Sequence, residues 1–401
     1  MPTQFTQYKK PALVLGGGGT KAAAFHTGVC VALQEKGFVF AGGTAKQVKE
    51  TLAQAKGQPV FQTYVGSSSG SIISSFLAKG YSPEDILKAT ISRKELNFFN
   101  HSWFTKSTAK LPPIQYRDLF SFNLSIDQAK KILKSFVSFS ALKNTRSLES
   151  LLKAYLPLSG ILSPHKIEKY FKTTLDSENN FQNLGVDLFI LCSKLDGLGL
   201  VAFSKYQKNY SDMEYADYAL ISEAIAGSTA MPGIFSPFPI TNKKETRFFY
   251  DGGILEDLAP QIADTQKADL VILSNPIIPY QYHDSKGSLS EHGIPFILTQ
   301  AIYQLMYKQT KTEKSRKKQL TDTFNKLKKH LDGLKLSVEE KDAIFSILEK
   351  QLHFKKNTKY VYIQPEKTDY QLFWSDHISL NKELLSYAFK KGFKAGIAAL
   401  K

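Results

Sequence analysis

The sequence predicts an α/β fold, in which a mostly parallel central sheet is flanked by helices and interrupted by helical insertions. Short apolar runs bounded by Gly, Pro, Asn or Asp alternate with helical patterns along much of the 401 residues. These runs are apolar at successive positions, which is typical of strands that are buried on both faces. Hydrophobic residues make up 42% of the chain and aromatic residues 12%, which favours a folded protein. We expect residues 1–401 to form a single domain.

Five apolar runs are predicted to be strands of this sheet, and four segments between them are predicted to be helices. The strands are 12–15, 61–65, 187–192, 269–273 and 360–363. The helices are 21–36, 69–79, 164–175 and 216–226. Strands that alternate with helices usually pair in parallel, because each helix carries the chain back along a face of the sheet.

Residues 97–158 depart from this alternation. They are rich in Phe, Leu, Ser and Lys, and they contain amphipathic stretches such as "IDQAKKILKSFVSF". We expect a helical insertion over the sheet, in a position where it could act as a lid.

Residues 302–356 are a second departure and are predicted to form a basic helical hairpin. Gly333 marks the end of the first helix, and "SVEE" places Ser337 and Glu340 as a capping box for the second. Apolar residues recur at helical spacing before the break, at Phe324, Leu327, Leu331 and Leu334.

The charge of the chain indicates an anionic partner. The formal net charge is +16, which is compatible with binding to nucleic acid, a membrane surface or an acidic protein. Half of this excess lies between residues 301 and 361, where 15 Lys and Arg stand against 7 Asp and Glu, a balance of +8. A solvated helical surface is the alternative. The first residues to test for anion binding are Lys314, Arg316, Lys317 and Lys318.

No targeting segment is predicted. Only "PALVL" separates the basic pair Lys9 and Lys10 from a run of glycines, which is too short for a signal-peptide core, and no run of about 18 apolar residues occurs. Cys30 and Cys192 lie in apolar stretches and are expected to be buried thiols. We expect a cytoplasmic or peripheral membrane protein, or a bacterial protein exported without a cleavable signal peptide.

The stretch "LVLGGGGTKAAAF", Leu13–Phe25, predicts a site for negative charge. Glycines between a strand and a helix expose backbone N–H groups, which can bind a phosphate or a transient oxyanion. The Walker A pattern fails, because Thr20 and not a glycine stands directly before Lys21, and Ala22 and not a hydroxyl residue stands directly after it. Gly17, Gly19 and Ala22 match the dinucleotide pattern, but no strand nearby ends in the acidic residue that this pattern needs.

A second motif, "VGSSSGS", follows a predicted strand and opens a predicted helix. It contains G-x-S-x-G, with Gly66, Ser68 and Gly70 at the required positions. Such a turn is a nucleophile elbow, because its small residues let the chain bend sharply and present the Ser68 hydroxyl at the helix N-terminus. Ser67 and Ser69 fit less well, since neither has glycines two residues away on both sides.

A third motif, "RFFYDGGILEDLAP", places Asp251 at the end of a predicted strand, before two glycines. Taken by itself this arrangement is typical of an Asx-turn. Together with the glycine loop and the serine elbow it forms a constellation, whose order along the chain is oxyanion loop, serine and aspartate.

These three motifs, in this order, resemble those of the patatin-like phospholipase family. Gly17–Val29 reads "GGGTKAAAFHTGV" and is similar to the glycine-rich loop of the family. Gly66–Gly70 matches its G-x-S-x-G, and Asp251–Gly253 matches its D-G-[GA]. Lys21 stands where many relatives have Arg, so a planar fork is replaced by a point charge.

The resemblance implies a patatin-like fold and a lipid acyl hydrolase of the phospholipase A type that uses a Ser68–Asp251 dyad. It implies support of the loop by Lys21 and no cofactor or metal. The expected oxyanion donors are Gly17, Gly18 and Gly19, and the expected elbow glycines are Gly66 and Gly70.

The implied substrate is a phospholipid or another lipid ester, reached at a peripheral anionic membrane surface and without a role for nucleic acid. An activating protein is compatible with the resemblance, but no motif identifies one. The stretch "MPGIFSPFP" could line an acyl channel through Pro232, Phe235, Pro237 and Phe238.

Two other functions fit the residues. A soluble esterase would complete a Ser-His-Asp triad with His283, His292 or His377, each of which follows Asp251 in the chain. A catalytically silent membrane- or protein-binding module would keep the fold without the chemistry. His26 belongs to the helix after the glycine loop and is expected to be structural.

Overall fold

The computed structural model describes residues 5–90, 111–123, 159–210, 213–256, 258–352, 354–375 and 377–401. Most of the predicted insertion at 97–158 lies outside the described residues. Its described part, 111–123, contains the short helix α5 (Tyr116–Leu119) and the strand β5 (Ser121–Phe122). The lid therefore stays a prediction.

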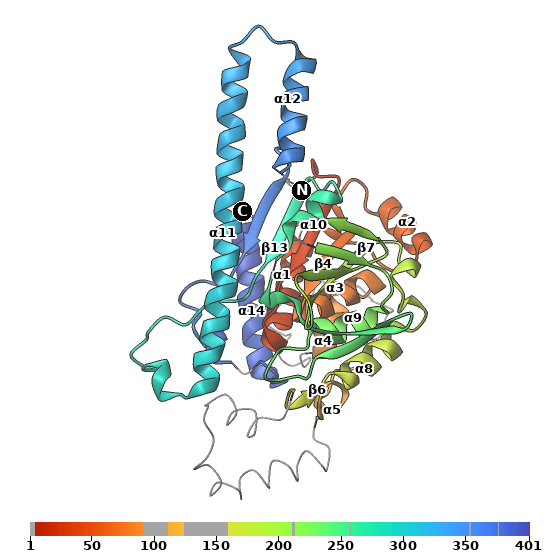
Figure 1. The fold of residues 1–401 in the computed structure, drawn as a ribbon, viewed down its shortest axis with the longest axis vertical. Helices are drawn as coiled ribbons and strands as arrows, with labels where there is room; N and C mark the ends of the chain where they lie inside the picture. The colour runs from red at the N-terminus through yellow and green to blue at the C-terminus, as the bar shows by residue number, and fades with distance from the viewer. Residues whose placement is uncertain are drawn as a thin grey trace, which may run out of the picture.

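Five consecutive strands of a ten-stranded sheet run in parallel and form the centre of the protein (Figure 1). Each of them lies within two residues of a predicted strand, and the predicted α/β class is confirmed. In order across the sheet they are β14 (Lys359–Ile363), β13 (Leu270–Ser274), β1 (Pro11–Leu15), β4 (Thr63–Ser67) and β7 (Asp187–Lys194).

Further strands extend the sheet beyond β7, and their pairings are antiparallel except for the parallel pair of β8 with β10. They are β8 (Leu200–Phe203), β10 (Met213–Ala216), β9 (Lys208–Tyr210) and the hairpin of β11 (Phe238–Asn242) and β12 (Glu245–Asp251). Two small sheets lie apart from it, one of β2 (Val39–Phe40) with β3 (Val60–Phe61) and one of β5 with β6 (Leu162–Ser163).

The predicted helix at 216–226 is wrong at its start. Ala216 is the last residue of β10 and pairs with Phe203 of β8, and the helix α9 runs over Ile221–Ser228. Ala216 favours helix locally, but its hydrogen bonds to β8 decide its conformation.

Alternate residues of the buried strands pack on opposite faces of the sheet. Leu13 and Leu15 of β1 belong to one apolar cluster, whereas Ala12 and Val14 belong to another. The second cluster is covered by α10 (Pro260–Thr265). The first is covered by α1 (Gly19–Glu35), α2 (Ala45–Gln54), α3 (Ser69–Lys79), α4 (Pro83–Thr90), α8 (His165–Leu175), α9 and α14 (Lys382–Ala399).

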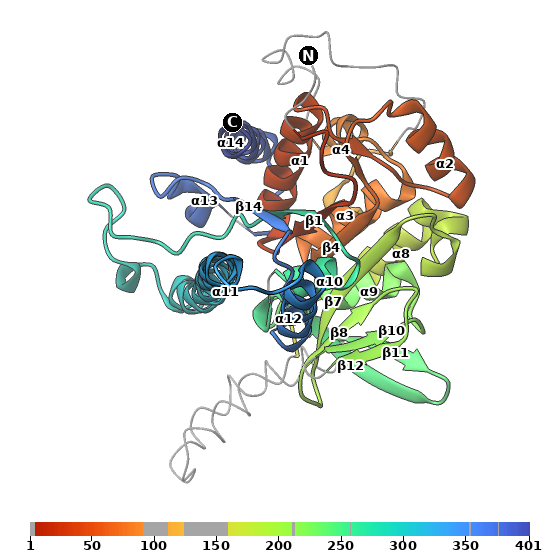
Figure 2. The same ribbon diagram turned by 90° about the horizontal axis from the view of Figure 1, so that it is seen from above.

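The helices α1 and α14 cross in close contact, and they lie side by side in Figure 2. A Cβ atom at Gly28 would lie 2.1 Å from the carbonyl oxygen of Phe389, and one at Gly392 would lie 2.0 Å from that of Phe25. Glycine is therefore required at both positions, because any side chain would separate the two backbones.

Residues 294–351 form a long helical hairpin that extends beyond the sheet (Figure 1). Its helices are α11 (Ile294–Asp332), which begins eight residues before the predicted segment, and α12 (Val338–Gln351). The Ser337 hydroxyl accepts a hydrogen bond from the Glu340 amide at 3.2 Å, and the Glu340 carboxylate accepts one from the Ser337 amide at 2.8 Å. Phe324 and Leu331 of α11 are buried against Phe345 and Phe354.

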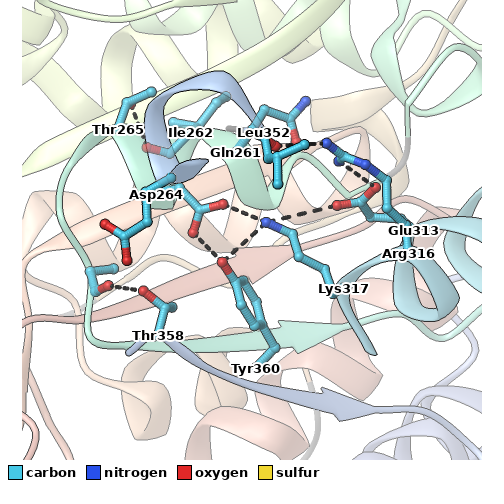
Figure 3. Close-up of polar contacts among 12 residues, drawn as sticks. Gln261, Ile262, Asp264, Thr265, Glu313, Arg316, Lys317, Leu352, Thr358 and Tyr360 are labelled. Carbon is cyan, nitrogen blue, oxygen red and sulfur yellow. Dashed lines mark hydrogen bonds and ion pairs between the residues drawn. The ribbon is translucent and has the colours of Figure 1, made fainter. Parts of the chain in front are cut away.

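A buried ion pair ties this hairpin to the sheet (Figure 3). The Lys317 Nζ atom of α11 lies 2.6 Å from Oδ2 of Asp264 in α10, and the two side chains are only 4% and 8% exposed. The hydroxyl of Tyr360 in β14 donates to the other Asp264 oxygen and accepts from Lys317 at 3.1 Å.

The four residues first expected to bind an anionic surface therefore do not form one exposed cluster. Lys317 is buried in the ion pair. Arg316 contacts Glu313 and donates to the carbonyl oxygen of Leu352, and the Lys314 ammonium lies 5.1 Å from the centre of the Tyr362 ring. The sequence could not distinguish these roles, since burial depends on α10 and β14, which lie far away in the chain.

Candidate active site

Ser68 occupies the turn between β4 and α3, as the elbow motif predicts. Its φ is 51° and its ψ is −123°, a strained conformation for a residue other than glycine. A Cβ atom at Gly66 would lie 2.6 Å from the carbonyl oxygen of Gly70, and one at Gly70 would lie 2.1 Å from that of Leu15. The two flanking glycines are therefore both required, Gly66 by the tight turn itself and Gly70 by the close approach of β1.

Two further serines hold the elbow in place. The Ser68 amide donates a hydrogen bond to the hydroxyl of Ser228 in α9 at 2.9 Å. The Ser71 hydroxyl donates to the Ser68 carbonyl oxygen at 2.6 Å. Sequence reasoning missed Ser228, because nothing in the local pattern of α9 links it to a residue 160 positions earlier.

Asp251 ends β12 and lies beside Ser68. The two strands that carry these residues both pair with β7 at neighbouring positions: Ser67 pairs with Leu191, and Asp251 pairs with Cys192. The close packing leaves no room for a side chain after the aspartate, since a Cβ atom at Gly252 would lie 2.4 Å from the Leu191 carbonyl oxygen.

The Asp251 carboxyl group accepts a hydrogen bond from the Gly253 amide at 2.9 Å, and hydrogen bonding by the Ser68 side chain also lowers its pKa. Burial raises the pKa of Asp251 from 3.8 to about 6, and the two hydrogen bonds oppose part of this rise. The carboxylate is therefore a stronger base than an exposed aspartate, as proton abstraction from a hydroxyl needs.

The glycine loop faces the same cavity. Gly18 and Gly19 have φ values of 129° and 76°, and both line the cavity together with Ser68 and Asp251. Gly17 is not among the residues that line it. The 17-residue helix α1 begins at Gly19, so its N-terminus adds positive potential to this side of the cavity.

The loop is braced by a segment near the C-terminus. The Thr20 amide donates to the His377 carbonyl oxygen at 2.8 Å, and its hydroxyl donates to that of Ser379 at 2.7 Å. The buried Lys21 ammonium donates to the carbonyl oxygens of Phe373 at 3.2 Å and Ser375 at 2.8 Å. Lys21 thus ties the start of α1 to the segment 373–375, through carbonyl groups that no sequence motif could reveal, and its support of the glycine loop stays a prediction.

The three histidines considered for a Ser-His-Asp triad, His283, His292 and His377, have different surroundings in the structure. His283 stacks on Tyr370, and His292 hydrogen-bonds the Lys286 carbonyl oxygen; neither lines the cavity. His377 does line the cavity, but its Nε2 atom hydrogen-bonds the hydroxyl of Tyr303 at 2.7 Å. Burial, with a smaller effect of Lys21, lowers the pKa of His377 to about 3, so this imidazole is neutral.

His26 is structural in its contacts. Its two ring nitrogens hydrogen-bond the Ser274 hydroxyl and the Gly16 carbonyl oxygen, each at 2.8 Å, and burial lowers its pKa to about 4. These bonds join α1 to the ends of β1 and β13.

The rest of the cavity is lined mainly by apolar residues, which come from several helices. Phe235, one of four residues expected to line an acyl channel, lines this cavity, whereas Pro232, Pro237 and Phe238 do not. Other apolar contributors are Ile72 and Phe76 of α3, Ile167 of α8, and Ile302 and Met306 of α11.

Within the described residues, no group of three His, Cys, Asp or Glu side chains is arranged to hold a metal ion. None of the described helices is long and apolar enough to cross a membrane.

The match to a family profile agrees with the motifs. Among solved structures, the crystal structure of VipD from Legionella pneumophila matches 98% of this chain and 66% of its own length, with 15% identity and a TM-score of 0.36. The chain thus spans slightly less than two thirds of that structure. A search of curated proteins gave no match. Residues 13–264 match the profile of the family described as patatin-like phospholipase, and this region contains the glycine loop, the serine elbow and the Asp251 turn. The chain belongs to the patatin-like phospholipase family.

Proposed function

We propose that the protein cleaves carboxylic ester bonds of membrane lipids, as a phospholipase of the A type that uses Ser68 and Asp251. Membership of the family supports lipid acyl hydrolysis in general. The finer proposal depends on one observation. The Ser68 side chain lies beside a buried carboxyl group of raised pKa, and both line an apolar cavity beside the glycine loop.

In the first half-reaction the Ser68 Oγ atom attacks the ester carbonyl carbon, and its proton passes to Asp251. The carbonyl oxygen becomes an oxyanion, for which the amides of Gly18 and Gly19 and the N-terminus of α1 are the proposed donors. When the tetrahedral intermediate collapses, the lysolipid alcohol leaves with the proton from Asp251, and an acyl-enzyme forms.

In the second half-reaction water replaces the alcohol. Asp251 takes a proton from the water as it attacks the acyl carbonyl carbon, and the same loop amides hold the second oxyanion. Collapse releases the fatty acid and returns the proton to Ser68 Oγ. No imidazole takes part, because Asp251, whose pKa burial raises to about 6, accepts the proton directly.

The decisive experiment incubates the pure protein with mixed phospholipids and identifies released fatty acids and lysolipids by mass spectrometry. Ser68→Ala and Asp251→Asn are each expected to lower the rate by at least about 10³-fold, with little further loss in the double variant, because the two residues act as a unit. Ser75→Ala is the matched control, since Ser75 is buried in the same helix but does not line the cavity. Full activity in Ser68→Ala would overturn the proposal.

The same assay addresses the rival functions. A triad esterase would lose its activity in His377→Gln, whereas the dyad is expected to keep Ser68-dependent turnover. A silent binding module would release no product from any lipid.

A further inference from the structure

Four exposed apolar side chains form one face on the first half of α11. Ile294, Ile297, Leu298 and Leu305, which we call the apolar ridge, follow one another at helical spacing and therefore point the same way. Their exposed fractions are 71%, 48%, 58% and 57%. Single exposed apolar residues are ordinary, but a contiguous set on one helix face marks an interaction surface.

The apolar ridge adjoins the mouth of the cavity that contains Ser68. Ile302 lines the cavity, and Leu298 and Leu305 lie one helical turn to either side of it. Leu255, which is 41% exposed, follows the cavity-lining residue Ile254 and shares a surface groove with Leu305. Apolar side chains therefore follow one another from the lining of the cavity to the outside of α11.

We propose that the apolar ridge inserts into the surface of a lipid bilayer and so places the cavity mouth where lipid esters can enter it. This proposal rests on the proposed function, because an acyl chain leaves a bilayer most readily along a continuous apolar path. A helix with an apolar face and a surplus of lysine is the kind that lies at the membrane interface.

The charge of α11 favours a bilayer over a second copy of the chain as the occupant. The helix contains nine Lys and Arg against three Asp and Glu, and exposed lysines begin one turn after Leu305, at Lys308 and Lys311. Two copies meeting through this face would bring like charges together, whereas anionic headgroups beside the inserted ridge would be complementary to them.

The test measures binding to phosphatidylcholine vesicles in about 1 M salt, where the screening length of about 3 Å suppresses the contribution of the lysines. Binding is measured in a Ser68→Ala background, so that the vesicles stay intact. The test variant replaces Ile294, Leu298 and Leu305 by Ser. The control replaces Leu198, Val338 and Ile347 by Ser, which are exposed by 95%, 71% and 67% and lie in the β7–β8 turn and on α12.

The ridge variant is expected to lose roughly tenfold in vesicle affinity for each side chain removed, about 1.4 kcal/mol each, and the control is expected to bind like the parent. Equal binding by the ridge variant and the parent would overturn the proposal. So would a parent dimer that light scattering shows to dissociate in the ridge variant.

The proposed function is read out separately, as fatty acid release by the wild-type chain. Ridge-dependent binding without release would leave the docking surface standing and overturn the hydrolase. Release of fatty acid, together with vesicle binding that does not depend on the apolar ridge, would support the hydrolase and overturn the docking surface.

Discussion

The protonation of Asp251 is expected to control the rate of the proposed reaction. Burial raises the pKa of Asp251 to about 6, and only the carboxylate can accept the Ser68 proton. The rate constant kcat/KM should therefore fall about tenfold for each pH unit below 6 and reach a plateau above about pH 7. A pH profile measured with a water-soluble short-chain ester checks this, and an acid limb near pH 4 would contradict it.

The same buried carboxyl group is expected to reduce the stability of the fold at neutral pH. Its pKa is higher in the folded state than the ordinary 3.8, so its stabilising contribution is fully present below pH 3.8 and is lost as the pH rises through about 6. Two pKa units correspond to about 3 kcal/mol. Asp251→Asn should therefore gain up to about 3 kcal/mol in free energy of unfolding at pH 7.5 but little at pH 4, in urea titrations. An equal gain at both pH values would refute this assignment.

Gly18 is expected to tolerate no side chain. Its φ of 129° is strained for other residues, and a Cβ atom would lie 2.9 Å from the Ala22 Cβ atom. Gly18→Val should displace the loop and lower turnover by roughly 10²- to 10³-fold, the effect of losing one oxyanion donor. Gly57→Val is the control, because Gly57 also has a positive φ but no atom within 4 Å of an added Cβ. Thermal unfolding of both variants separates loss of activity from loss of fold.

At the scale of elements, the α11–α12 hairpin depends on the Lys317–Asp264 pair for its attachment to α10 and β14. Lys317→Met would leave the buried Asp264 carboxylate without its cation, and the expected loss is about 3–5 kcal/mol in free energy of unfolding. Lys318→Met changes the same charge at an exposed neighbour and should stay within about 0.5 kcal/mol of the wild type. The double variant Lys317→Met/Asp264→Asn should recover much of the loss, and failure to recover would show that the pair is not the cause.

At the scale of the whole molecule, the basic surplus is expected to draw the protein to anionic membranes. The lysines to test are the exposed ones of α11 at 311, 318, 326 and 329, because Lys317 is buried. Near an anionic leaflet each lysine contributes about 1 kcal/mol, within a Debye length of about 8 Å at physiological salt. The protein should therefore sediment with phosphatidylserine vesicles much better than with phosphatidylcholine vesicles, and salt should release it.

Reversal of those four lysines to Glu should abolish this preference for anionic vesicles. The control reverses the exposed lysines of α2 and α8 at 46, 49, 166 and 169 and changes the net charge equally. Equal losses in both variants would mean that net charge, and not α11, governs binding.

Local patterns were sufficient to predict much of this protein. The five parallel strands follow from short, mostly apolar runs bounded by Gly, Pro, Asn or Asp, and the Ser68 elbow follows from glycines two residues away on both sides. The second helix of the hairpin follows from the Ser337–Glu340 capping box. Each of these depends on the steric and hydrogen-bonding properties of residues within one strand, turn or helix end, so contiguous sequence contains the necessary information.

The tertiary structure decided what these elements do together. Ser68 and Asp251 meet because β4 and β12 both end against Leu191 and Cys192 of β7, a register that no local pattern specifies. The raised pKa of Asp251, the burial of Lys317 and the brace from Lys21 to the Ser375 carbonyl oxygen all depend on partners far away in the chain. Strand register and desolvation are set by contacts between distant segments, and these exist only once the chain has folded.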